Sequence, residues 1–207
     1  MFVVLAGSLA FGIYSYHYKS RQIPIGNLLQ QATYLHDQKV SVPHFTFTDH
    51  NQKSFTVGDI DNKWTLWFFG FTHCPDICPI TLGTLSTAVD QLQDELNIDD
   101  LYIVFVSVDP DRDQPEQLKT YVSAFSQKVI GVTSSQQNLN AFMKNMGVVA
   151  VKQENENSPD EYLINHSSSV FLIAPDTGIN AIFGSPHTVA DIKQDYLTLR
   201  KHFAINE

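Results

Sequence analysis

Cysteine is scarce in this chain of 207 residues, which contains only Cys74 and Cys78. So small a number excludes a disulfide-rich scaffold, in which several bridges take the place of a large core. Basic residues are also few: 13 lysines and arginines stand against 22 aspartates and glutamates, which gives a net charge of −9. Binding to nucleic acid needs a basic stripe, and the sequence shows none. We therefore predict no nucleic-acid partner.

Formal charge is absent from residues 2–18, and Lys19 and Arg21 follow this stretch. Its length is at the lower edge for a membrane-spanning helix and also suits the core of a signal peptide. Neither a basic region before it nor an Ala-x-Ala cleavage pattern is present. We expect a transmembrane anchor or uncleaved signal at residues 1–18, a polar linker at 19–41 and one folded domain at 42–207.

The hydrophobic pattern after the linker alternates between strands and helices. Strands are predicted at residues 44–48, 54–57, 64–69, 102–108, 129–132, 148–151, 162–164, 169–174 and 179–183. Helices are predicted at residues 79–96, 115–126, 139–146 and 189–203. The first two strands form an N-terminal hairpin. The whole pattern is typical of an α/β fold, with a mixed central sheet flanked by helices.

The two cysteines lie four residues apart in residues 70–79, which read Gly-Phe-Thr-His-Cys-Pro-Asp-Ile-Cys-Pro. This segment joins a predicted strand to a predicted helix, where unpaired helix amides favour thiolate over thiol. Side chains four apart on a helix point the same way, so one soft metal ion or one disulfide could join them. A purely stabilising disulfide would gain little across so short a loop. A zinc site would need further ligands, and redox pairs more often have two intervening residues.

His166 is the candidate third ligand, at the junction between two predicted strands. Two thiolates and an imidazole suit copper, because thiolate favours Cu(I) and imidazole allows Cu(II) to bind as well. We expect the other ring nitrogen to donate to a carbonyl or carboxylate. His73 is a weaker candidate beside Cys74, and the acidic residues of 109–113 are better suited to capping a loop. From the residues alone, a metal site and a redox dithiol both remain open.

Four stretches of the chain resemble the copper-binding proteins of the Sco/SenC family. They are residues 70–79, residues 107–113 (Ser-Val-Asp-Pro-Asp-Arg-Asp), residues 162–167 (Tyr-Leu-Ile-Asn-His-Ser) and the turn at residues 172–178. The resemblance covers about residues 42–203, with matching order and spacing. One departure is Asn165, because the family commonly has an acidic residue there. The neutral amide removes one negative charge near the metal and leaves the three expected ligands in place.

The resemblance implies a thioredoxin-like fold behind an N-terminal membrane anchor, with Cys74, Cys78 and His166 as copper ligands. It implies a copper metallochaperone for the dinuclear copper centre of cytochrome c oxidase subunit II or another copper protein, with other copper chaperones as partners. The alternative is a membrane-anchored thiol-disulfide oxidoreductase that reduces the partner's cysteines through Cys74 and Cys78. In either case the domain is expected to face the periplasm or the mitochondrial intermembrane space.

Overall fold

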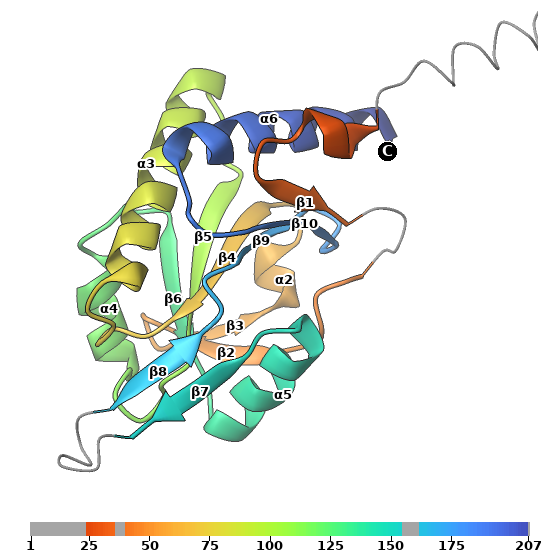
Figure 1. The fold of residues 1–207 in the computed structure, drawn as a ribbon. Coiled ribbons are helices and arrows are strands. Elements are labelled where there is room, and N and C mark those ends of the chain that lie inside the picture. Colours follow the sequence, from red (N-terminus) through yellow and green to blue (C-terminus); the bar gives the residue numbers. More distant parts are fainter. Residues whose placement is uncertain (1–23, 36–39, 155–161, 207) are drawn as a thin grey trace, which may run out of the picture.

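The computed structural model describes residues 24–35, 40–154 and 162–206 (Figure 1). The main sheet has eight strands: β1 (Ala32–Tyr34), β2 (Thr46–Asp49), β3 (Ser54–Thr56), β4 (Trp64–Gly70), β5 (Leu101–Ser107), β6 (Val129–Thr133), β9 (Val170–Ile173) and β10 (Ile179–Phe183). Their spatial order is β1-β10-β9-β4-β5-β6-β2-β3. The central strands β4, β5 and β6 are parallel, whereas β9 is antiparallel to β4. A separate two-stranded ribbon pairs β7 (Ala150–Gln153) with β8 (Leu163–His166).

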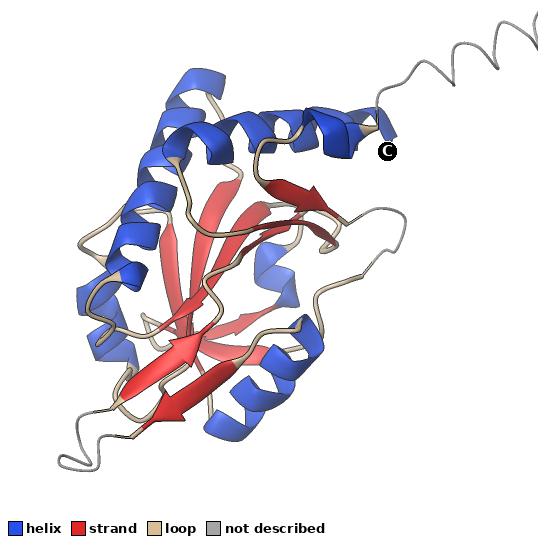
Figure 2. Cartoon of the chain, viewed as in Figure 1, coloured by secondary structure: helices blue, strands red, loops and turns tan. Residues whose placement is uncertain are grey.

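Helices cover both faces of the main sheet (Figure 2). They are the 3-10 helix η1 (Ile25–Leu28) and the α-helices α2 (Val57–Ile60), α3 (Ile77–Leu96), α4 (Pro115–Val122), α5 (Gln136–Met146) and α6 (Val189–Asn206). Helices α3, α4 and α6 lie on one face, and α5 lies on the other. This arrangement confirms the predicted mixed α/β class. A central strand with one parallel and one antiparallel neighbour, followed by the cysteine segment and a helix, is the thioredoxin-like arrangement.

Strand β4 shows why the core has two halves, because its side chains alternate between the two faces of the sheet. Trp64 packs edge-on against Tyr196 of α6, with 5.7 Å between the ring centroids. Trp67 points the other way and lies 5.7 Å from the ring of Phe142 on α5. All seven residues of β4 are buried, as the continuous apolar run predicts. The end of β4 is therefore a rigid platform for the loop that follows.

Most predicted elements are present, with shifted ends. The N-terminal hairpin is confirmed, since β2 and β3 pair antiparallel. Residue 57 does not continue β3 but begins the short helix α2, because Thr56 and Asp59 form a capping box around its first turn. Helix α3 begins at Ile77, two residues earlier than predicted, and α4 ends at Val122, four residues earlier.

Residues 24–34 differ from the expected linker at 19–41, because they are packed against the domain. Strand β1 pairs with β10 at the edge of the main sheet. The buried carboxylate of Asp195 on α6 accepts hydrogen bonds from three successive backbone amides, at 2.7 Å from Gln30, 2.8 Å from Gln31 and 2.7 Å from Ala32. Such charge-assisted bonds to a buried acceptor hold the segment firmly.

The expected anchor at residues 1–18 lies outside the described residues. Within residues 24–35, 40–154 and 162–206, no helix combines the length and the apolar character needed to cross a membrane.

Candidate metal centre

The two cysteines occupy different kinds of backbone. Cys74 lies in the loop between β4 and α3, and Cys78 is the second residue of α3. The expectation that both share one helix face is therefore wrong. The loop instead turns back on itself, with the Cys74 amide donating to the carbonyl of Phe71 at 3.2 Å. Cys78 is fully buried and Cys74 is half-buried, so Cys74 is the more accessible sulfur.

Gly70, the last residue of β4, makes room for the sulfur of Cys78. A Cβ atom at this position would lie 2.8 Å from Cys78 Sγ and 2.8 Å from a ring carbon of Phe105. Both distances are too short for non-bonded atoms, so a larger residue would displace the sulfur or the ring. The sulfur therefore rests directly on the backbone of β4.

Asp113 holds the cysteine loop in place. Its buried carboxylate accepts hydrogen bonds from the Thr72 amide at 2.9 Å, the Thr72 hydroxyl at 2.6 Å and the Ser107 hydroxyl at 2.6 Å. These bonds tie the loop after β4 to the end of β5, which confirms that this acidic segment caps a loop. His73 lies beside the same carboxylate, with Nδ1 3.8 Å from Asp113 Oδ1, and is not part of the cluster of possible ligands.

His166 approaches the cysteines from the ribbon, as the last residue of β8. Its Nε2 lies 3.3 Å from Cys78 Sγ, and its Nδ1 lies 3.0 Å from the carbonyl oxygen of Ser167. Because a carbonyl only accepts, we assign the proton to Nδ1, which leaves the Nε2 lone pair facing the sulfur. The expected bond from the second ring nitrogen is thus confirmed. The rings of Phe68 and Phe71 pack around the imidazole with centroids at 6.0 and 5.9 Å.

Cys74, Cys78 and His166 together form a compact set of ligand atoms. The two sulfurs and one imidazole nitrogen all lie within 4.8 Å of one another. One ion with bonds of about 2.0–2.3 Å to three such atoms in a plane would hold them roughly 4 Å apart. The set therefore fits a single metal ion after a small contraction. Asn165 faces the opposite side of the ribbon, where its side chain donates to Gln153 at 3.2 Å.

Burial favours the uncharged forms of Cys78 and His166 in the metal-free site. Desolvation raises the pKa of the Cys78 thiol far above its usual range, with a further rise from the hydrogen bond with Cys74, and a backbone bond from Phe71 offsets only part of this. For Cys78, the expectation that the helix start favours thiolate is therefore wrong, since desolvation outweighs the helix amides. Burial also lowers the pKa of His166, against a smaller opposing effect of the Ser167 carbonyl. Binding of a metal cation would thus release protons from the thiols.

The ribbon that carries His166 is fastened by Tyr162, Arg112 and Asp109, which sequence reasoning did not assign to the site. The Tyr162 hydroxyl donates to Asp109 Oδ1 at 2.6 Å, and Arg112 Nε donates to Asp109 Oδ2 at 2.5 Å. The guanidinium also stacks on the Tyr162 ring at 3.6 Å. Burial and the bond to Asp109 raise the pKa of Tyr162 to about 12. The spacing of Asp109 and Arg112 was visible in the sequence, but their partner 50 residues away in the chain was not.

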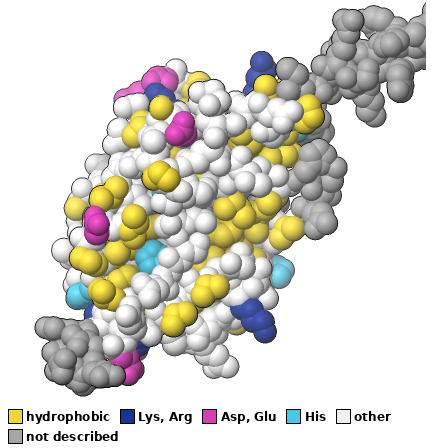
Figure 3. Space-filling model, in the orientation of Figure 1, with side chains coloured by type: hydrophobic (Ala, Val, Ile, Leu, Met, Phe, Trp, Pro, Cys, Tyr) yellow, Lys and Arg dark blue, Asp and Glu magenta, His cyan; other side chains and the backbone are white. Residues whose placement is uncertain are grey.

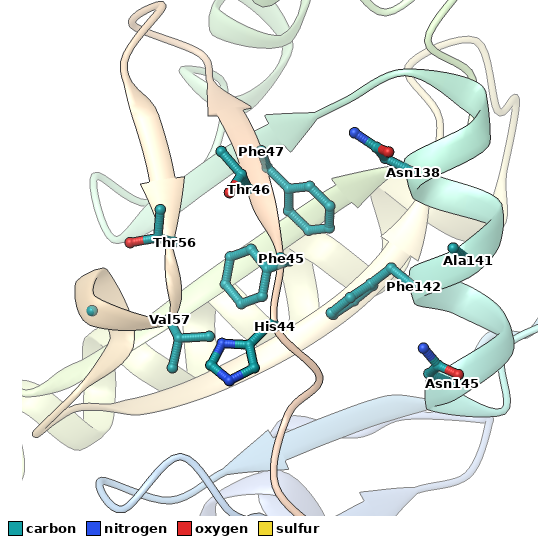
Figure 4. A pocket seen from close by; sticks show the side chains of 11 residues that line it. His44, Phe45, Thr46, Phe47, Thr56, Val57, Asn138, Ala141, Phe142 and Asn145 are labelled. Atoms are coloured by element: carbon teal, nitrogen blue, oxygen red, sulfur yellow. The ribbon is translucent and has the colours of Figure 1, made fainter.

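A separate cavity of about 700 Å³ lies between the β2–β3 hairpin and α5 (Figure 4). Its floor is aromatic, with Phe45 and Phe142 facing one another, and its rim carries neutral polar groups such as Asn138 and Asn145. None of the three candidate ligands lines it. The metal centre is thus defined by its donor atoms rather than by this cavity.

Comparison with known proteins identifies the family. Residues 34–200 match the family model described as SCO1/SenC. "Protein SCO1 homolog 1, mitochondrial" of Arabidopsis thaliana is 37% identical over 145 residues, which is 70% of this chain and 42% of that protein. "Protein sco1" of Schizosaccharomyces pombe is 31% identical over 193 residues, or 92% of this chain and 72% of that protein. The chain thus spans less than half of the Arabidopsis relative.

Solved structures agree with this result. The crystal structure of Arabidopsis thaliana ScoI with copper bound superposes with a TM-score of 0.74 at 32% identity, covering 79% of this chain and 99% of that one. The copper-bound crystal structure of yeast Sco1 gives a TM-score of 0.72 at 27% identity, covering 78% and 88%. The family model and these relatives span most of the described domain, and the chain belongs to the SCO1/SenC family.

Proposed function

We propose that this protein is a copper chaperone that holds copper through Cys74, Cys78 and His166. The observation that carries the proposal is the convergence of two sulfurs and one imidazole nitrogen within 4.8 Å. This donor set suits Cu(I) through the thiolates and also accepts Cu(II) through the imidazole. Copper is present in the solved structures of two similar proteins, from Arabidopsis and yeast, which supports the choice of metal.

A site of three ligands can also release its copper. Ligand exchange would begin at the half-buried Cys74, where an acceptor's thiolate forms a new bond to copper as the bond to Cys74 breaks. Copper stays Cu(I) throughout, so no electrons move. The acceptor's thiols lose their protons as they bind copper, and Cys74 and Cys78 each take up one proton as they leave it. Because burial raises the pKa of Cys78, regaining its proton favours release.

The test is an anaerobic titration of the full chain with Cu(I) and Cu(II). Wild type should bind one copper ion, and Cys74→Ser and Cys78→Ser should each abolish stoichiometric binding because each variant loses one of the two thiolates on which the affinity for Cu(I) depends. His166→Ala should weaken Cu(II) binding most, because the imidazole is the ligand that suits Cu(II). The exposed His44 serves as a control, and His44→Ala should bind as wild type does. Stoichiometric copper in either cysteine variant would contradict the proposal.

The second candidate function is thiol-disulfide exchange with a partner's copper-ligand cysteines. It is favoured by the closeness of the sulfurs of Cys74 and Cys78, which lie within 4.8 Å of each other. Cys74 would attack the partner's disulfide, because it is the accessible sulfur, and Cys78 would then release the partner as a reduced dithiol. This chemistry oxidises Cys74 and Cys78 to a disulfide and does not need His166. If His166→Ala loses copper but keeps full activity in a complementation assay, thiol exchange is the function.

The partner we propose is the dinuclear copper centre of cytochrome c oxidase subunit II or a similar copper protein. The chain would act from a membrane anchor at residues 1–18, with the domain in the periplasm or the mitochondrial intermembrane space. The mitochondrial location of the Arabidopsis relative supports such a compartment.

A further inference from the structure

Large hydrophobic side chains are exposed on both sides of the metal centre. On α3 they are Ile77 and Ile80, which flank Cys78, and Ile80 is 58% exposed. On the ribbon they are Val151, which is 56% exposed, and Leu163, and Val149 comes directly before its first strand. We call these five residues the apolar collar. Since Cys78 Sγ and His166 Nε2 are only 3.3 Å apart, the two halves of the collar meet at the ligands.

The register of the ribbon explains why Val151 and Leu163 are exposed in the described part of the chain. Ala150 lies opposite His166, and Val151 lies opposite Asn165. Side chains alternate along a strand, so His166 faces inward to the cysteines while Val151 and Leu163 face outward. Several large apolar side chains exposed around one site are characteristic of a protein interaction site.

Few charges interrupt the collar, although the protein carries a net charge of −9. The exposed charged residues next to its members in sequence are one acid, Asp76, and one base, Lys152. Figure 3 shows hydrophobic side chains spread over the face that holds the ribbon and the start of α3, with few charged ones among them. The five members of the collar are themselves uncharged and contact a partner through apolar groups, whereas acids such as Asp76 and Glu154 stand at its border.

The position of the collar limits what can cover it. Cys78 has no exposed surface and His166 is half-buried, so copper is reached most easily from Cys74. A protein that takes copper by ligand exchange must bring its own cysteines to this point, and its surrounding surface then lies on the collar. The occupant is therefore the copper acceptor itself.

We propose that the apolar collar docks the copper acceptor through an uncharged apolar surface around the acceptor's cysteine ligands. This inference rests on the proposed function and goes beyond it, because it assigns residues that bind no metal. The collar holds the acceptor long enough for the three-ligand site to exchange its copper. Its effect is on transfer and not on copper affinity.

The test measures Cu(I) transfer from the full chain to the copper-free soluble domain of cytochrome c oxidase subunit II. The variants Ile80→Glu and Val151→Glu place one charge in each half of the collar. Each should load one copper ion as wild type does but transfer it about tenfold more slowly, because burying an unpaired carboxylate weakens docking. Raising the salt concentration from about 50 mM to about 500 mM should change the wild-type rate by less than about threefold, since little charge is involved.

Ile205→Glu is the matched control, because Ile205 is also exposed but lies on α6. Transfer at the wild-type rate by copper-loaded Ile80→Glu and Val151→Glu would overturn the docking inference. So would an equal slowing by Ile205→Glu, or a loaded wild type that transfers nothing to this acceptor. Failure of wild type to bind copper would contradict the proposed function instead, so the two failures are distinguishable. Ile80→Ser and Val151→Ser repeat the test without a new charge and should slow transfer less.

Discussion

The two sides of the metal centre are built differently. On the cysteine side, the loop with Cys74 and the start of α3 directly follow strand β4 of the eight-stranded sheet. Strand β4 is fully buried, and the Cys78 sulfur rests on its last residue, Gly70. The histidine side is a two-stranded ribbon outside that sheet. Yet both sides are tied to one loop after β5, the cysteine side through Asp113 and the histidine side through Asp109. The site therefore combines a rigid pair of ligands with a third ligand on a separate support.

The largest expected effect comes from the rigid side. Asp113→Ala would remove the carboxylate that accepts from three donors, two on the half-buried Thr72 and one on the buried Ser107. Each lost bond to a carboxylate costs roughly 1–2 kcal/mol, so the free energy of unfolding should fall by about 3–5 kcal/mol. Urea unfolding measures this change. The exposed Asp111 is the control: Asp111→Ala should change stability by less than about 0.5 kcal/mol, and an equal loss in both would contradict the role of Asp113.

A smaller effect is expected on the ribbon. Tyr162→Phe removes only the hydroxyl that bonds Asp109, so stability should fall by about 1 kcal/mol. Copper affinity should fall by up to about tenfold, because His166 is then held less firmly. Hydrogen exchange should quicken for the amides of β7 and β8 and stay unchanged for β4 and β5. Faster hydrogen exchange in β4 and β5 as well as in β7 and β8 would show that the supports of the cysteines and of His166 are not independent.

The smallest effect is on the dependence of stability on pH. Burial lowers the pKa of His166 in the folded, copper-free protein, whereas the unfolded chain has the usual value of about 6.5. Below that value the unfolded state binds a proton that the folded state resists, so stability is lost as the pH falls. Between about pH 7 and about pH 5, copper-free wild type should therefore lose more stability than His166→Ala. A steeper loss of stability in His166→Ala than in wild type would contradict the lowered pKa of His166.

The sequence predicted which side chains converge at the candidate site better than it predicted how they are held. Cys74, Cys78 and His166 were predicted as ligands because sulfur and imidazole have few other roles at such positions, and the fold brings them together. The reason first given for the cysteines was wrong, since only Cys78 is helical. Thiolate character was also misjudged for Cys78, because burial depends on residues of β4 and β5 that pack over the sulfur.

The supports depend on contacts between distant parts of the chain, which local patterns do not record. Strand β1 is three residues long and has no strong pattern of its own; Asp195, 163 residues further on, holds its first amide. The ribbon likewise depends on Tyr162 meeting Arg112 from another loop. By contrast, β4 was predicted almost to its ends, because a continuous apolar run is a purely local signal.

Gly70 has a consequence for how this chain can evolve. It bears no donor atom and never touches a metal, yet a single methyl group there would occupy the space of the Cys78 sulfur. Such a substitution would first displace the Cys78 sulfur from the metal centre. It would destabilise the fold only to the extent that the sheet had to adjust. A residue with no side chain thus limits the candidate metal centre as strictly as the cysteines do, because any added side chain would take the space of the sulfur.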